Sequence, residues 1–263
     1  MIAVLPVLFG AGCSEKLPET DPAAPLVVGL DPSYPPFEMI GLSGELEGID
    51  VELAWALGRH LNRPVIFEKM SFDGLIPALQ ARKIDVIISA MTITEERQRA
   101  VDFSRPYFRT GLSLLVGKKS GIRSVTDLDP ARHRIAVVNG TTGHIYVRQK
   151  LKAFPPGKIL VLKQDAMAAL EVAQGNADAF IYDSLSVLKH HQKNPENTEA
   201  LLETFQSENW GIVMRKGSDD LKRQVNGFLE TLRANRGLDS LLVRYLGRDK
   251  TQLEAAGVGF PPE

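Results

Sequence analysis

Short apolar segments alternate with amphipathic segments along this chain, and that alternation restricts the folds that the chain can adopt. Apolar runs stand at 26–30, 65–67 and 86–88. Between them, large apolar residues recur four positions apart over 50–61, and Ser71 precedes a further segment of helical spacing. These spacings predict strands and helices in alternation. Such an order is typical of a mainly parallel β-sheet covered by helices.

The same order returns in the second half of the chain. Apolar strands are expected at 134–138, 159–162 and 179–182. The segment 140–143 is expected to open one helix, and a second helix is expected over 165–174. Because both halves repeat one strand–helix order, the sequence predicts two similarly built lobes.

Two polar breaks separate these halves. An apolar run at 114–116 leads into the polar segment 117–121, and a second apolar run, 210–214, leads into 215–218. The chain is therefore expected to leave the first lobe, build the second and return, before closing with two helices. We predict an α/β fold of two Rossmann-like lobes joined by two hinge strands. The predicted limits are 26–115 with 211–263 for the first lobe, 116–210 for the second, and 219–233 and 238–246 for the closing helices.

Composition excludes several classes of partner. The 263 residues carry 31 basic and 32 acidic side chains, for a formal net charge of −1. A balance so close to zero offers no electrostatic footprint for nucleic acid or for an anionic membrane surface. The one cysteine, Cys13, excludes a disulfide framework and a cysteine-based zinc site. His190 and His191 are adjacent, so on a helix they point in different directions and make a poor metal site.

The first residues resemble the end of a lipoprotein signal peptide. An apolar run at 2–9 is followed by the small residues 10–12 and then by Cys13. We predict that 1–25 is a leader and polar tether and that Cys13 is a lipid anchor. The expected location is periplasmic or extracytoplasmic. The alternative is a free thiol in a disordered leader.

Hydroxyl residues and an arginine follow the predicted strand at 86–88. Ligands in open α/β sheets lie beyond the carboxyl ends of strands, which is where Thr92 and Arg97 fall. An arginine there can hold a carboxylate with two parallel hydrogen bonds. The alternative is that Thr94 caps a helix and that Arg97 is solvated.

Two further candidates follow strands of the second half. The segment 140–143 contains Thr141 and Thr142, whose hydroxyls and helix-start N–H groups suit an anion. It is not a P-loop, because no Gly-Lys-Ser/Thr follows. Asp183 directly follows the strand 179–182 and can hold an ammonium group. The alternative is that it caps the next helix.

Aromatic side chains accompany these positions. Tyr34 and Phe72 stand beside predicted loops or caps and can form apolar walls around a ligand. Phe37 is assigned to the core. The sequence shows no nucleophile–base pair and no metal-binding cluster, so no cofactor is expected.

The segment 26–247 resembles the periplasmic solute-binding proteins for polar amino acids, which have the type II periplasmic binding fold. The stretches 72–85, 93–97 and 101–104 carry the resemblance most specifically. The stretches 31–38, 48–54 and 140–143 fit the family pattern as well.

The resemblance implies a role for each candidate residue. Arg97 corresponds to the clamp on the ligand's α-carboxylate, and Asp183 corresponds to the partner of its α-ammonium. Thr92 and the backbone around Ala90 support the clamp from the first lobe, and Thr142 supports it from the second. Met91 and Thr141, beside them, are also expected to be ligand-binding residues. Tyr34 and Phe72 correspond to faces that sandwich the ligand's side chain, whose polar or basic tip Asp31 can reach.

The implied function is that of a monomeric extracytoplasmic receptor. It would capture one polar or basic amino acid between its lobes and deliver it to the membrane permease of an ABC importer. Two alternatives use the same fold: a dehydratase acting on cyclohexadienyl substrates such as prephenate or arogenate, and an amino-acid sensor domain. Retention of both Arg97 and Asp183 favours binding over catalysis.

Overall fold

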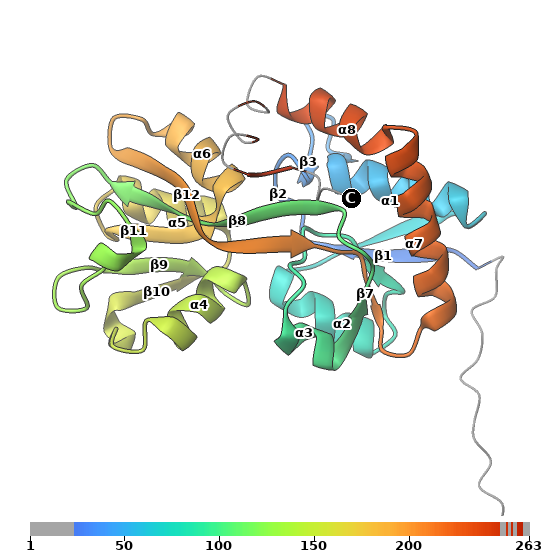
Figure 1. The fold of residues 1–263 in the computed structure, drawn as a ribbon, viewed down its shortest axis with the longest axis horizontal. Helices are drawn as coiled ribbons and strands as arrows, with labels where there is room; N and C mark the ends of the chain where they lie inside the picture. The colour runs from blue at the N-terminus through green and yellow to red at the C-terminus, as the bar shows by residue number, and fades with distance from the viewer. Residues whose placement is uncertain (1–23, 248–250, 252–253, 255–256, 260–263) are drawn as a thin grey trace, which may run out of the picture.

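The computed structural model describes residues 24–247, 251, 254 and 257–259. Most of the predicted leader, with its lipid-anchor candidate Cys13, lies outside the described residues. Two α/β lobes stand side by side, and two long strands run between them (Figure 1). This arrangement confirms the predicted fold class.

The first lobe is built on a five-stranded sheet. The second strand in the order is parallel to its neighbour on each side, and the fourth strand is antiparallel to both of its neighbours. The strand order is β5 (Val65–Lys69), β1 (Leu26–Leu30), β6 (Val86–Ile87), β13 (Val213–Arg215) and β7 (Val101–Phe103). The helices are α1 (Ile49–His60), α2 (Leu75–Gln80), α3 (Glu95–Ala100), α7 (Asp219–Ala234) and α8 (Gly237–Leu246).

The second lobe repeats that plan strand for strand, with the same order of parallel and antiparallel pairs. Its order is β10 (Ile159–Leu162), β9 (Ile135–Val138), β11 (Ala179–Asp183), β8 (Phe108–Gly117) and β12 (Thr198–Trp210). The helices are α4 (Thr142–Lys150), α5 (Asp165–Ala173) and α6 (Ser184–Lys193). The inner strands β1, β6, β9 and β11 are largely buried and mostly apolar, as expected for sheets covered on both faces.

The hinge is formed by β8 and β12. These strands pair antiparallel from Phe108↔Trp210 to Gly117↔Thr198, with an irregularity between Leu201 and Gln206. Both belong to the second sheet, and the chain returns to the first sheet at β13. The predicted lobe limits, 26–115 with 211–263 and 116–210, remain a prediction.

Some elements were not predicted. A small antiparallel sheet is formed by β2 (Ser33–Tyr34), β3 (Glu38–Ile40) and β4 (Leu46–Glu47). The helix expected after Ser71 begins instead as a 3₁₀ turn, η1 (Phe72–Gly74), and Ser71 makes no side-chain capping bond. Two more 3₁₀ turns are η2 (Val125–Asp127) and η3 (Pro156–Lys158).

Candidate functional site

A cavity lies between the lobes at the carboxyl ends of their parallel strands. It holds about 580 Å³ of empty space, including its open mouth. Every predicted ligand-binding residue except Met91 lines it. The first lobe contributes Asp31, Ser33, Tyr34, Glu38, Phe72, Ser89, Ala90, Thr92 and Arg97, the second contributes Val138, Thr141, Thr142, Lys163, Gln164, Asp165, Tyr182 and Asp183, and β12 adds Glu208 and Trp210.

Arg97 is buried, not solvated, with 7% of its surface exposed. It lies on α3, whose N-cap Thr94 accepts a hydrogen bond from the Arg97 backbone N–H, so the expected cap also forms. The guanidinium donates to Thr92 O (2.7 Å) and to Gly140 O of the other lobe (3.1 Å). It stands 5.3 Å from the centre of the Phe72 ring. Burial lowers the pKa of Arg97 to about 10, so it stays charged at neutral pH.

Asp183 is 6% exposed and faces the cavity from the end of β11. Its Oδ1 accepts the N–H groups of Leu185 and Ser186, each at 3.1 Å, so Asp183 is also the N-cap of α6. Burial raises its pKa to about 6, while these N–H groups lower it. Asp183 is therefore mainly ionised at neutral pH, and its second oxygen makes no capping bond.

The threonines differ in what their hydroxyls already bind. Thr141 Oγ1 donates to Val138 O at 2.7 Å, which fixes the turn between β9 and α4. Thr142 is the first residue of α4, at the positive end of the helix dipole. Thr92 Oγ1 donates to Glu208 Oε2 at 3.3 Å. Thr92 and Thr142 thus bring hydroxyls to the cavity from opposite lobes.

Aromatic rings and Asp31 shape the opposite wall. Tyr34 stacks on Phe37, which is fully buried in the core as predicted. Asp31 accepts hydrogen bonds from the backbone N–H of Phe72 (2.9 Å) and from Ser33, both backbone and hydroxyl. Asp31 therefore holds the Phe72 turn in place as well as facing the cavity.

Met91 is the predicted site residue that does not line the cavity. Its side chain is 1% exposed and packs in the first lobe's core with Ile87 and Val101. The reason is the backbone of Ala90, whose φ of +46° is in the left-handed region. That turn directs Ala90 and Thr92 to the cavity and sends Met91 inward.

Sequence reasoning missed several lining residues, of which the buried acids matter most. Glu208 is 4% exposed, and burial raises its pKa to about 7. Asp165 accepts hydrogen bonds from Ser186 and stands 2.9 Å from Nε2 of the buried His190. One signal was available for Glu208: it stands two residues before Trp210, where the second hinge crossover was expected.

A third missed acid of the cavity lining, Glu38, pairs with the buried carboxyl group of Asp50. Glu38 accepts from the Ser89 hydroxyl (2.7 Å), while Asp50 accepts from Ala90 N–H (2.7 Å) and from Tyr107 (2.9 Å). Burial raises the pKa of Asp50 to about 7, and burial beside Asp50 raises that of Glu38 well above its usual range. A proton on Glu38 satisfies one otherwise unpartnered oxygen of each carboxyl group.

Within the described residues, no group of three or more histidine, cysteine or acidic side chains is placed to hold a metal ion. None of the described helices is both long and apolar enough to cross a membrane.

A cavity closed by two like α/β lobes, with a buried arginine on one side and a buried aspartate on the other, defines a two-lobed binding protein for small charged solutes. The chain belongs to the bacterial extracellular solute-binding proteins, family 3, whose model matches residues 26–248.

Its relatives bind amino acids. The chain is 29% identical to the L-cystine-binding protein TcyJ of Escherichia coli over 96% of both chains. It is 30% identical to the L-arginine-binding protein of Pseudomonas aeruginosa, over 89% of this chain and 92% of that one.

Solved structures of amino acid-binding proteins are also similar to this chain. An ancestral arginine-binding protein bound to arginine matches with a TM-score of 0.78 and 36% identity, over 84% of this chain and 98% of that one. An ancestral amino acid-binding protein, AncCDT-1, described as a precursor of cyclohexadienyl dehydratase, matches with a TM-score of 0.74 and 35% identity, over 84% of this chain and 94% of that one.

Proposed function

We propose that this chain binds one polar or basic α-amino acid in the interlobe cavity for delivery to an ABC importer. The observation that carries the proposal is the placement of Arg97 and Asp183, one buried charge of each sign, at one cavity from opposite lobes. A buried zwitterion must have both of its charges met, because an unpaired buried charge is costly. Arg97 suits the α-carboxylate and Asp183 the α-ammonium.

The cavity lining supports a polar or basic side chain on the ligand. Acidic side chains outnumber basic ones among the lining residues, since only Arg97 and Lys163 carry a positive charge there. The rings of Tyr34 and Phe72 offer flat faces for the ligand's carbon chain, and Asp31 lies beside them.

Delivery follows from closure of the lobes. A ligand that contacts both lobes favours the closed form by its differential affinity for it, and a membrane permease can recognise that form. We propose that the protein acts as a monomer outside the cytoplasm, anchored by lipid on Cys13. The apolar run before Cys13 and the family's extracellular description support this location.

One observation favours an enzymatic second candidate. Glu208 is a buried cavity acid whose pKa is raised to about 7, a value suited to a proton donor. One structural neighbour is described as a precursor of cyclohexadienyl dehydratase. Incubation with prephenate and with arogenate, followed by product chromatography, tests this activity. Turnover that is lost in Glu208→Gln would move the protein to the enzyme class.

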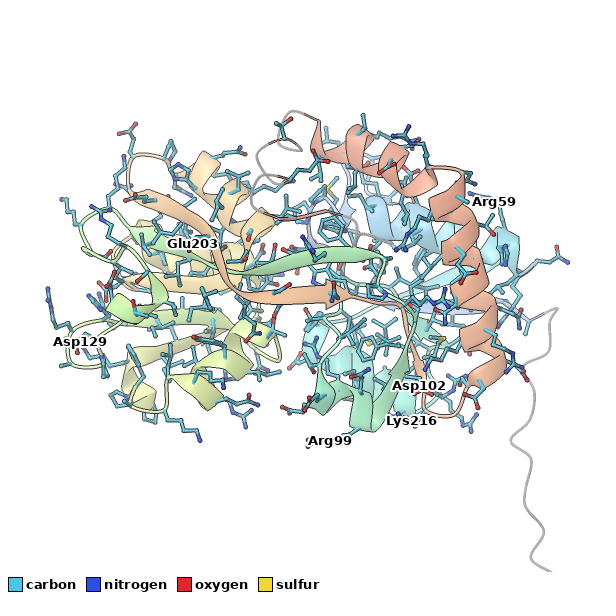
Figure 2. All side chains as sticks on the ribbon, viewed as in Figure 1. Arg59, Arg99, Asp102, Asp129, Glu203 and Lys216 are labelled. Carbon is cyan, nitrogen blue, oxygen red and sulfur yellow. The ribbon has the colours of Figure 1, made fainter. Side chains whose placement is uncertain are left out.

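Calorimetric titration with the twenty amino acids tests the binding proposal. We expect at least micromolar affinity for one polar or basic amino acid, lost in Arg97→Ala and in Asp183→Asn. Arg99→Ala is the matched control, because Arg99 lies on the same helix α3 but is exposed, at the edge of the lobe (Figure 2). Tight binding that survives Arg97→Ala would overturn the site assignment.

A further inference from the structure

Glu208 lies on a hinge strand, whereas the other acids of the cavity belong to one lobe or the other. It lies on β12 opposite Thr110 of β8, and its carboxylate reaches the cavity. Oε1 accepts a hydrogen bond from Gln206 Nε2 at 3.2 Å, and Oε2 accepts from Thr92 Oγ1 at 3.3 Å. Thr142 of the second lobe lines the same cavity, and its hydroxyl favours the ionised form of Glu208. Glu208 thus faces one threonine from each lobe.

Those two threonines and Arg97 are the groups assigned above to the ligand's α-carboxylate. This inference therefore rests on the proposed function. The Glu208 carboxylate accepts a hydrogen bond from Thr92 and faces Thr142 and Arg97, which are the donors that a ligand α-carboxylate needs. Two carboxylates that share donors in a buried site cannot both stay ionised, because each disfavours the charge of the other.

The charged groups around Glu208 do not remove this conflict. Arg97 faces it from α3 and favours its ionised form, but Asp183 faces it from β11 and disfavours that form. The hydrogen bonds of Arg97 go to the carbonyls of Thr92 and Gly140. When a ligand carboxylate binds the guanidinium, Glu208 loses part of the stabilisation that the positive charge of Arg97 gives to its ionised form.

We propose that Glu208 is a further ligand-binding residue, which takes up a proton from solvent when the amino acid binds and donates that O–H to the ligand's α-carboxylate. No other bond is made or broken. Glu208 then completes the α-carboxylate site together with Arg97 and the two threonine hydroxyls. Its place on β12 couples proton uptake to the hinge that closes the lobes.

The state of Glu208 before binding fits this step. Burial raises its pKa to about 7, so at pH 8 the carboxyl is mostly ionised and available to gain a proton. Asp183, with a pKa near 6, is already ionised at that pH and does not gain one as it meets the α-ammonium. The hydrogen bonds of the Glu38–Asp50 pair go to the Ser89 hydroxyl, the Ala90 N–H and Tyr107, whereas Glu208 bonds the Thr92 hydroxyl.

The test is calorimetric titration with L-arginine and with L-glutamine at pH 8, in phosphate and in Tris buffer. These buffers release different heats when they give up a proton, so the difference counts protons taken up. We expect close to one proton per bound amino acid in the wild-type protein. We also expect affinity to fall by up to about tenfold per pH unit above pH 7.

Glu208→Gln isolates the residue, because the amide keeps the shape and offers a permanent N–H donor. We expect binding to persist while proton uptake and its pH dependence are lost. Glu203→Gln is the matched control on the same strand, since Glu203 is exposed (Figure 2). The Glu203→Gln variant should take up protons on ligand binding as the wild-type protein does.

The outcomes separate the two proposals. Amino-acid binding without proton uptake in the wild type, or proton uptake that persists in Glu208→Gln, would overturn the role of Glu208 and leave the proposed function standing. No binding of any amino acid by the wild type would overturn both. Because the wild-type buffer comparison needs no variant, the test holds even if Glu208→Gln folds poorly.

Discussion

Arg97 on the first lobe donates a hydrogen bond to the backbone carbonyl of Gly140 on the second, at 3.1 Å. Beside it, Asn139 Nδ2 donates to Asp73 Oδ2 at 2.8 Å. These bonds hold the rims of the cavity together. They also make the closed form sensitive to small changes at the turn between β9 and α4.

Gly140→Ala is expected to weaken ligand binding as well as the fold. Gly140 has a φ of +74°, and an added Cβ would lie 3.2 Å from Asp73 Cβ across the lobe interface. The left-handed backbone costs about 1 kcal/mol of stability. Interference with closure adds an estimated five- to tenfold loss of affinity, from about 1 kcal/mol. Calorimetry and urea unfolding measure the two effects.

Gly175→Ala is the control for that variant. Gly175 has a φ of +77°, but nothing lies within 4 Å of an added Cβ. Its loss of stability should be similar while affinity stays unchanged. Equal affinity losses in both variants would show that closure is not hindered at Gly140.

Asn139→Ala is expected to reduce affinity by roughly two- to tenfold, because the closed form loses one hydrogen bond worth about 0.5–1.5 kcal/mol. Calorimetry of Asn139→Ala, Asp73→Ala and the double variant gives the coupling energy. Gln149→Ala is the comparison across the same interface, since its bond to Glu96 is 3.5 Å long and weak. Additive losses at Asn139 and Asp73 would contradict the pairing.

The Glu38–Asp50 pair is expected to make the protein less stable as pH rises from 5 to 8. The pKa of Asp50 is raised to about 7, and that of Glu38 is also raised well above its ordinary value. Between the unfolded and folded pKa values the folded state holds more protons, so raising the pH favours unfolding, by on the order of 1 kcal/mol per pH unit.

Urea unfolding at pH 5, 6, 7 and 8 measures this slope. Glu38→Gln removes one titrating group and should reduce the slope, to which Glu208 and Asp183 still contribute, whereas Glu45→Gln, at an exposed position, should leave it unchanged. A slope of the same size in Glu38→Gln would mean that other groups cause the pH dependence.

Phe37→Ala is expected to cost about 3–5 kcal/mol of unfolding free energy. Phe37 is fully buried and contacts Tyr34, Phe108 and Trp210, so its ring joins the cavity wall to the hinge strands. Trp55→Ala removes a larger ring that is 44% exposed and should cost less. Equal losses, measured by urea unfolding, would place the main core elsewhere.

Much of the fold could be predicted because its strands and helices have clear local patterns. The strand Leu26–Leu30 and the helix Ile49–His60 follow from apolar runs and from i+4 spacing. The strand Thr198–Trp210 could not be predicted in this way. It is half-buried and carries charged and polar residues along its length, so it lacks an apolar run.

The sequence by itself determined the order of elements and the chemistry of Arg97 and Asp183, because these depend on residue type and on neighbours along the chain. Tertiary structure alone decided which side chains meet. The left-handed turn at Ala90 turns Met91 into the core, and the pairing of β12 with β8 aims Glu208 at the threonines of both lobes. Direction and register depend on contacts between segments distant in sequence, which no local pattern encodes.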